Sequence, residues 1–309
     1  MVNSGWSHSE SPFHPGEIAM QTQLGIAERM DQQGRRLIRD YLPDQHRQFF
    51  AQLAYLVVGT VDGLGNLWAS ILVGKPGFLT SANEHTLTVS ARPLFGDPLT
   101  ETLKENIDIG LLGIDFQTRR RNRLNGIVTA INQQGFEVQV KQSFGNCPQY
   151  IQVRNLEFKS HLKDITTPKP VHRISILAEQ ERDLITSANT LFIATAYQDQ
   201  SAGMAAGVDV SHRGGQPGFV SIDQQDRLII ADFPGNSHFN TIGNLLLNPR
   251  TGLLFIDFEQ GNLLYLTGTT EVIESKEEIN NDQDQKVERF LCFNLSQGYR
   301  VEGSLPKTL

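Results

Sequence analysis

Residues 110–126, GLLGIDFQTRRRNRLNG, recur as residues 252–268, GLLFIDFEQGNLLYLTG, and the two stretches align without a gap. The similarity continues upstream, where KPGFLTSANEHTLTVSA at 75–91 aligns with QPGFVSIDQQDRLIIAD at 216–232. Each copy spans on the order of 90 residues, which is longer than the repeat of a solenoid. The sequence therefore predicts a duplicated domain.

Within each copy the pattern is that of short strands. Stretches rich in β-branched and aromatic residues are bounded by Gly, Asn and Asp, as in YLVVGTV (55–61), LTVSA (87–91), GIVTAI (126–131) and FEVQV (136–140). DGLGN at 62–66 predicts a hairpin turn, and one helix per copy is expected at 97–107 and at 236–248. Because closure removes exposed strand edges, we expect a mainly β fold of two small barrels that form an internal pseudo-dimer.

The repeats and their flanking segments suggest a domain division. We assign the first repeat to residues 46–158 and the second to 176–309, with an N-terminal arm over 1–45. The arm has apolar residues at roughly helical spacing over 17–41, which predicts one amphipathic helix. Residues 155–175, with TTPKP at their centre, are expected to be a linker, and 274–288 a charged, solvated loop or a short exposed helix.

Composition limits the possible functions. Of the 309 residues, 39% are apolar and 20% charged, and no apolar run is long enough to cross a bilayer. The start of the chain lacks a basic segment and an apolar core, so no secretory signal is expected. Cys147 and Cys292 form no CxxC pair and no disulfide framework, which favours the cytoplasm. The formal charge of −7 argues against nucleic acid as a partner, so any anion site must be local.

Arginine residues distinguish the first copy of the repeat from the second. Arg119, Arg120, Arg121 and Arg123 lie where the second copy has EQGNLLYL. One interpretation is a hairpin kept soluble by charge. The other is that one or two guanidinium groups turn inward to hold a phosphate, for which their planar donors are suited.

The second copy contains a complementary element. VSHRGGQPGFV (210–220) precedes DFPGNSHFNTIGN (232–244), in which small polar residues lead into the expected helix. A helix N-terminus with such residues can bind an anion. A tight turn followed by an N-cap residue explains the same pattern without a ligand.

These motifs, in this order and duplicated, resemble the FMN-binding split-barrel family of pyridoxamine 5'-phosphate oxidase and its relatives. TRRRNRLNG, GNCPQYIQVR and the N-terminal SPFHPGE resemble a subfamily with two such barrels in one chain. The resemblance implies tandem split barrels with a flavin at the seam between them. It covers nearly the whole sequence.

The resemblance also implies which residues hold the cofactor. They come from three segments that match the family's motifs: Arg213, Gly218, Phe219, Val220 and Ser221; Asp232, Asn236, Ser237 and His238; and Arg121, Asn122 and Arg123 from the other half. Relatives have a basic residue where this chain has Ser237, so the phosphate charge must be met by His238, Arg213 or the first-copy arginines. The substrate-phosphate residues of the true oxidases have no match, so their vitamin B6 activity is not supported.

The resemblance therefore implies an FMN-binding flavoprotein that transfers electrons or hydride to an unidentified small molecule, with no catalytic side chain apparent. Rival interpretations are a haem-binding or haem-degrading barrel, with His161, His212 or His238 as axial ligand, and a non-enzymatic ligand-binding protein. A homodimer of pseudo-dimeric chains could assemble further cofactor sites.

Two further groups of residues in the sequence are candidates for metal binding or for thiol chemistry. His8, His14 and Glu17 could ligate a metal, but a flexible, exposed segment is favoured, and we predict no metal site. Cys147 could be oxidisable or lie near a flavin, although a free cysteine is more often a small buried hydrophobe.

Overall fold

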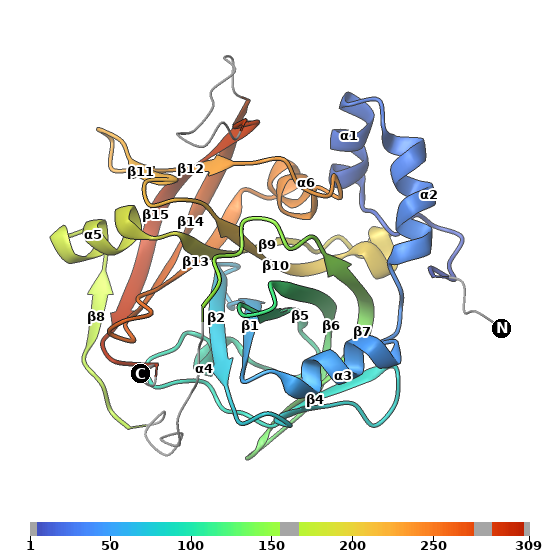
Figure 1. Cartoon of the computed structure of the whole chain (residues 1–309), viewed down its shortest axis with the longest axis horizontal. Helices are drawn as coiled ribbons and strands as arrows, with labels where there is room; N and C mark the ends of the chain where they lie inside the picture. The colour runs from blue at the N-terminus through green and yellow to red at the C-terminus, as the bar shows by residue number, and fades with distance from the viewer. Residues whose placement is uncertain (1–4, 155–166, 275–285, 306–309) are drawn as a thin grey trace.

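The computed structural model describes residues 5–154, 167–274 and 286–305. These residues form two antiparallel sheets, one from each copy of the repeat (Figure 1). The first sheet has the order β2-β1-β5-β6-β7-β4-β3. Its strands are β1 (Tyr55–Val61), β2 (Leu67–Val73), β3 (Leu79–Thr80), β4 (Thr86–Val89), β5 (Asp108–Asp115), β6 (Arg120–Asn132) and β7 (Gly135–Asn146).

The second sheet repeats this order as β10-β9-β13-β14-β15-β12-β11. Its strands are β9 (Thr190–Tyr197), β10 (Gly207–Gly214), β11 (Val220–Ile222), β12 (Leu228–Asp232), β13 (Arg250–Ile256), β14 (Leu263–Glu274) and β15 (Arg289–Val301). Even an irregularity is shared, because the register of β6 shifts at Asn125/Gly126 and that of β14 at the aligned Thr267/Gly268. The predicted mainly β, duplicated fold is confirmed.

Local sequence explains the turn between β1 and β2 in the first half. The β1–β2 hairpin forms where Asp62 Oδ1 accepts hydrogen bonds from the backbone N–H groups of Leu64 and Asn66. Gly65 adopts a φ of +81°, which a residue without a side chain tolerates. The hairpin expected at residues 62–66 is thus confirmed.

The two halves pack face to face across a shared core, which we call the seam. Each half also has a core of its own, and the seam core takes Val57 and Leu112 from the first half and Val208 and Leu254 from the second. Aligned glycines permit the close approach of the backbones. A Cβ on Gly110 would lie 2.6 Å from the carbonyl oxygen of Val208 in β10, and a Cβ on Gly252 would lie 2.5 Å from that of Leu67 in β2. The contact is therefore pseudo-twofold, because β2 and β10 are equivalent strands.

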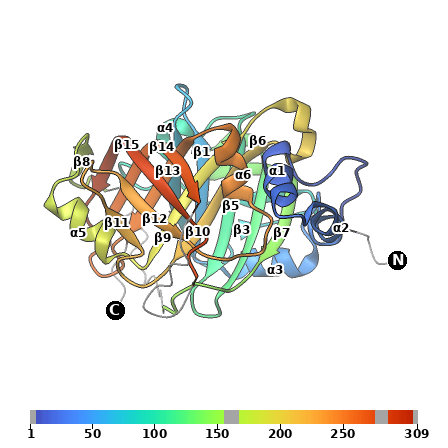
Figure 2. The ribbon, with the colours of Figure 1, turned by 90° about the horizontal axis from the view of Figure 1, so that it is seen from above.

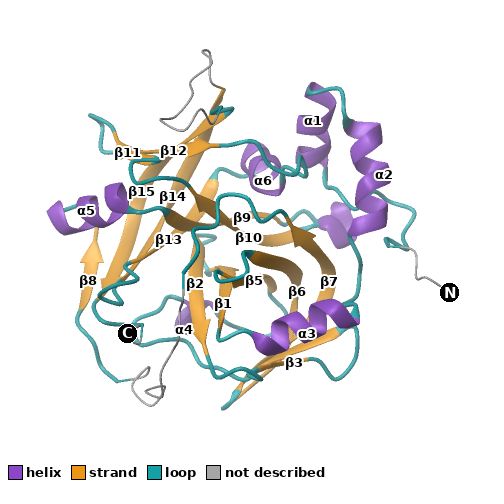
Figure 3. Ribbon diagram, in the orientation of Figure 1, coloured by secondary structure: helices purple, strands orange, loops and turns teal. Residues whose placement is uncertain are grey.

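The helices lie at the periphery of the sheets (Figure 3). They are α1 (Pro15–Gln23), α2 (Ala27–Leu37), α3 (Asp44–Gln52), α4 (Leu99–Thr102), α5 (Glu179–Ser187), the 3₁₀ helix η2 (Gln200–Ala205) and α6 (Asn240–Leu247). α1 and α2 lie at one end of the molecule, and α5 lies at the other (Figure 2). Among the described residues, no helix has the length and apolar character to cross a membrane.

The expected N-terminal helix over 17–41 is wrong in detail, because the segment forms two helices. Gly25 has a φ of +67° and separates α1 from α2, so the chain reverses direction there. α1 also begins earlier than expected, at Pro15, because His14 caps it: the backbone N–H of Gly16 donates to His14 Nδ1.

Three other segments differ from the sequence-based expectation or lie partly outside the residues that the structure describes. The helix expected at 97–107 shrinks to the four residues of α4, and Asn106 has a positive φ. The expected linker contains a short strand, β8 (Val171–Ile174), which pairs with β15; its residues 155–166 lie outside the described part of the chain. Of the expected loop at 274–288, residues 275–285 also lie outside it.

Candidate functional site

A pocket of about 100 Å³ opens at the seam, beside the free edge of β10. Its walls come from both halves of the chain: β6 and the residues after β7 on one side, and β10, the end of β12 and the start of α6 on the other. Its polar lining consists chiefly of Arg121, Arg123, Asn146, Ser211, His212, Arg213, Asp232, Asn236, Ser237, Asn240, Thr241, Glu288 and Arg289.

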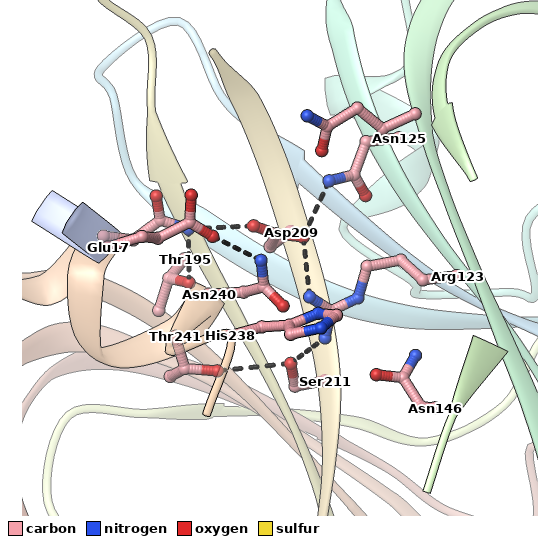
Figure 4. Close-up of polar contacts among 12 residues, drawn as sticks. Glu17, Arg123, Asn125, Asn146, Thr195, Asp209, Ser211, His238, Asn240 and Thr241 are labelled. Atoms are coloured by element: carbon pink, nitrogen blue, oxygen red, sulfur yellow. Dashed lines mark hydrogen bonds and ion pairs between the residues drawn. The ribbon is translucent and has the colours of Figure 1, made fainter. Parts of the chain in front are cut away.

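The alternation of side chains along β6 brings two of its arginines to the pocket. Arg121 and Arg123 face the seam, whereas Leu124, with the opposite orientation, enters the core of the first half. Arg123 Nη1 donates to Asp209 Oδ1 at 3.0 Å, and its Nη2 donates to Ser211 Oγ. The ion pair is buried on both sides (Figure 4). Arg123 is therefore held rigidly by β10.

Arg121 has a different environment. Its Nε donates to the carbonyl oxygen of Cys147 at 2.8 Å, and its Nη1 lies 3.1 Å from His212 Nδ1. No carboxylate pairs with Arg121 among the described residues. Burial, together with the neighbouring charges of Arg213 and Arg123, lowers the pKa of Arg121 to about 10. Arg121 is thus a largely buried cation without a counter-ion in the described part of the chain.

The hydrogen bond from Arg121 determines the tautomer of His212. A guanidinium group only donates, so His212 Nδ1 must accept and Nε2 must carry the hydrogen of a neutral ring. Burial and the positive charges of Arg121 and Arg213 lower the pKa of His212 well below its usual value, which keeps the ring neutral. Its Nε2 is buried without a hydrogen-bond partner in the described structure.

Two further arginines share one carboxylate at the pocket. Arg213 Nη2 and Arg289 Nη1 each lie 3.4 Å from an oxygen of Asp232, and Arg289 also pairs with Glu288 at 3.0 Å. The lining thus contains more arginines than carboxylates. Asp209 behind Arg123 and Glu274, which lies 3.4 Å from Arg289 Nε, add two carboxylates outside the lining, but neither pairs with Arg121.

α6 presents its N-terminus to the same pocket. Phe239, which precedes the helix, has the left-handed φ of +61°, and Ser237 has a φ of +59°. Such values are unusual for a phenylalanine and concentrate at functional loops. No side chain of the described residues caps the helix. The first-turn N–H groups of Asn240 and Thr241 have no acceptor in the described structure, so they are available to an anion.

The buried polar atoms left without partners around the pocket are predominantly donors. They include Arg123 Nε, Arg213 Nε and Asn146 Nδ2. Buried donors are normally satisfied, so a set of unsatisfied ones in a pocket rich in arginine points to a ligand rich in acceptors. The arrangement is chemically suited to an oxyanion such as a phosphate group.

The pocket brings together half of the residues that the sequence resemblance implicated. Arg121, Arg123, Arg213, Asp232, Asn236 and Ser237 line it, whereas Asn122, Gly218, Phe219, Val220, Ser221 and His238 do not. Phe219 and Val220 belong to the core of the second half. Asn122 is buried, and its position between Arg121 and Arg123 gives it the opposite orientation in β6.

His238 does not supply positive charge to this site. Its ring packs between those of Phe13 and Phe144, at centroid distances of 5.4 and 5.5 Å. Burial lowers its pKa to about 4, with a smaller contribution from Arg123, so the ring is neutral near pH 7. Of the groups expected to meet a phosphate charge, only the arginines are cationic in this structure.

Sequence reasoning missed several residues of the pocket. Arg289 and Glu288 come from a segment that showed no motif, and Arg289 directly follows the stretch expected to be a solvated loop. Tyr150 ends the segment GNCPQY, which did contribute to the resemblance, but only Cys147 of that segment was singled out; both residues line the pocket. Arg289 offered no local signal, because only the pairing of β15 with β12 brings it beside Asp232.

The metal-ligand candidates of the N-terminal arm are placed differently from expectation. His14 and Glu17 are buried, at 2% and 3% exposure, and therefore do not belong to a flexible, exposed segment. His8 pairs with Asp40 instead of with either of them. In the described ranges, no three His, Cys, Asp or Glu side chains are close enough together to hold a metal ion.

The pseudo-equivalent position at the seam has no comparable cluster of arginines. The aligned residues of Arg121 and Arg123 are Leu263 and Tyr265, as the pairing registers of β6 and β14 confirm. Both are fully buried in the seam core. The Tyr265 hydroxyl donates to Asp97 Oδ2 at 3.1 Å, and Ser70 Oγ donates to Asp97 Oδ1 at 2.6 Å. An aromatic side chain thus fills the space that the arginines line on the other side.

This second network gives a pH prediction. Burial raises the pKa of Asp97 to about 6, so the folded chain retains a proton there that the unfolded chain releases near pH 4. The contribution of Asp97 to stability is therefore present at low pH and lost as the pH rises from about 4 to about 6. The free energy of unfolding of Asp97→Asn, taken relative to that of the parent, should therefore increase by about 2 kcal/mol when the pH rises from about 4.5 to about 7.5, since one pKa unit corresponds to about 1.4 kcal/mol. Urea unfolding of both proteins at both pH values measures this change. The prediction is wrong if the difference in unfolding free energy between the two proteins is the same at both pH values.

Comparison with known proteins gives only distant structural similarity. No family model matches the sequence, and no curated protein matches it. A solved protein of Clostridium acetobutylicum, related to general stress protein 26 and described as of the pyridoxinephosphate oxidase family, is 16% identical, covers 40% of this chain and 87% of its own, and has a TM-score of 0.30. An FAD-binding protein of Mesorhizobium loti is 14% identical, covers 42% and 97%, and has a TM-score of 0.27.

A third solved structure, the haem storage protein HutZ of Vibrio cholerae, is 16% identical, covers 41% of this chain and 95% of its own, and also has a TM-score of 0.27. Similarity at this level assigns no function.

Proposed function

We propose that the seam pocket binds the phosphate group of FMN and that the chain is a flavoprotein. The observation that carries the proposal is Arg121, a largely buried guanidinium with no carboxylate partner in the described structure. A buried cation is costly unless an anion compensates it, so a bound phosphate would supply the missing counter-ion.

The residues present fit a phosphate in charge and in size. The pocket, of about 100 Å³, is lined by arginines and by the start of α6, so it can admit a phosphate group. In this proposal the rest of the cofactor extends along the seam, which is the position that the sequence resemblance to FMN-binding split barrels implies.

In this proposal the flavin supplies the electron or hydride transfer, and the chain's residues bind and orient it. Arg121 and Arg213, with the first-turn N–H groups of α6, would hold the phosphate. Arg123 would fix β6 against β10 through Asp209, so that the pocket is preorganised. We assign no acid or base, and an oxidoreductase that acts on a small molecule remains part of the proposal.

Haem binding is less well supported by the site. An axial histidine needs a ring nitrogen with a free lone pair, but Arg121 occupies Nδ1 of His212 and leaves Nε2 protonated. His238 is enclosed by Phe13 and Phe144, and His161 lies outside the described residues.

The absorption spectrum of the purified protein tests the proposal. We expect the bands of an oxidised flavin, and mass analysis of the heat-released molecule should identify FMN. Because the other seam position is filled by Tyr265, we expect one FMN per chain. A colourless protein that fails to bind added FMN would refute flavin binding, and two FMN per chain would refute the single site.

A further inference from the structure

The N-terminal arm contacts both halves of the chain next to the pocket. Gln142 Nε2 of β7 donates to the carbonyl oxygen of Pro12 at 2.7 Å, which ties the arm to the first half. On the second half, α1 packs against α6 without space for side chains. A Cβ on Gly16 would lie 2.1 Å from the carbonyl oxygen of Gly243, and one on Gly243 would lie 2.5 Å from the backbone nitrogen of Glu17. The arm is therefore closely fitted to the helix that opens onto the pocket.

One polar contact joins the arm to the first residue of that helix. Asn240 Nδ2 donates to Glu17 Oε1, while the backbone N–H of His14 donates to Glu17 Oε2 at 2.8 Å. Figure 4 shows Glu17 and Asn240 pointing toward one another beside Asp209. Glu17 is 3% exposed, and Asn240 lines the pocket. The contact thus lies between the arm and the helix terminus that would receive an anion.

We propose that Glu17 is a positioning residue for the anion site: by binding Asn240 it fixes the start of α6, so that the arm is an integral part of the binding site. The inference rests on the proposed function for its ligand, FMN. Glu17 itself does not line the pocket and acts through Asn240.

Backbone strain immediately before α6 explains why the start of this helix must be held by other residues. Phe239 and Ser237 hold positive φ values immediately before α6, and strained backbone persists only when the surroundings enforce it. The described contacts include no side-chain cap for α6, whereas Gln21 Nε2 donates to the carbonyl oxygen of His238 at 3.4 Å. The arm therefore contributes hydrogen bonds at two successive points of the loop that shapes the helix start.

A double-mutant cycle on FMN affinity tests the proposal. The proteins are the parent chain, Glu17→Ala, Asn240→Ala and the double variant, with the affinity of each measured by titration of FMN fluorescence. We expect each single change to weaken binding by about tenfold, as for loss of one buried hydrogen bond. The double variant should be no weaker than Asn240→Ala, because Glu17 acts through that residue. Glu28→Ala on the exposed side of α2 is the matched control, with unchanged affinity expected.

A second measurement follows the arm itself. Trypsin can cut at Arg29 and Arg36, which are exposed on α2, when the arm opens. Binding and arm docking are reciprocal, so FMN should slow this cleavage in the parent chain and slow it less in Glu17→Ala. The inference is overturned if the parent and Glu17→Ala bind FMN with equal affinity, or if FMN does not change the rate of trypsin cleavage of the parent chain.

The two proposals fail in different ways. If the parent chain does not bind FMN, the proposed function is wrong, and inorganic phosphate then serves as the probe in the same cycle. If FMN binds but the effects of Glu17→Ala and Asn240→Ala on affinity are additive, Glu17 does not act through Asn240 and only the positioning role is wrong. Urea unfolding of each variant separates a loss of affinity from a loss of fold.

Discussion

Arg121→Met is expected to weaken FMN binding by about 100-fold while leaving the folded chain at least as stable as the parent. Removing one partner of a buried, hydrogen-bonded charge pair costs about 2–5 kcal/mol of binding free energy, and each 1.4 kcal/mol or so is a factor of ten. In the free protein the same guanidinium is largely buried beside other arginines, and no carboxylate of the described residues pairs with it. Its removal relieves repulsion there, so affinity and stability change in opposite directions.

Titration with FMN and urea unfolding of the free protein measure the two effects. Arg119→Met is the matched control, because Arg119 is exposed in the turn before β6 and does not line the pocket. If Arg121→Met binds FMN with unchanged affinity, the Arg121 guanidinium does not hold the phosphate, and the interpretation of a charged, solvated hairpin is favoured. A marked loss of stability would show that its hydrogen bonds to Cys147 and His212 are structural.

Arg123→Met is expected to destabilise the folded chain by about 3–5 kcal/mol, the usual cost of leaving one partner of a buried ion pair without the other. Arg123 and Asp209 are both buried, and the guanidinium also donates to Ser211 Oγ. Asn125 and Asn244 would still donate to Asp209, but neither would neutralise its charge. Urea unfolding measures the loss.

A double variant, Arg123→Met with Asp209→Leu, identifies the cause. Replacing both partners by apolar residues of similar volume removes the unpaired charge, so much of the lost stability should return. If the double variant is less stable than Arg123→Met, the lost stability arises from lost packing or from the neighbouring amides rather than from the unpaired Asp209 carboxylate.

The contrast between Arg121 and Arg123 marks a limit of sequence reasoning. The gap-free repeat predicted the duplicated strands, and the loss of arginines from the second copy indicated one charged side of the seam. Nothing in TRRRNR showed that Arg123 has a carboxylate partner and Arg121 none, because Asp209 lies 86 residues further along the chain. Such a pairing depends on how the two sheets pack.

Other differences have a similar physical origin. The residues around His14 and Glu17 suggested a flexible, exposed segment, yet both side chains are buried because His14 stacks on Tyr197 and Glu17 accepts a hydrogen bond from Asn240 of α6. The strand β8 forms in a segment rich in proline because β15 offers an edge to pair with. Local pattern thus predicted the elements that carry their own hydrophobic period, and missed those that depend on a distant partner.

Joining the two sheets in one chain has a consequence for how the site could diverge. In a homodimer every substitution appears at both symmetry-related interfaces, so a change that improves one site alters the other. Here Arg123 and Tyr265 occupy equivalent positions and differ. Covalent linkage also makes the encounter of the halves intramolecular, with an effective concentration on the order of millimolar for short flexible linkers. Dilution that would separate two subunits therefore leaves this pocket assembled.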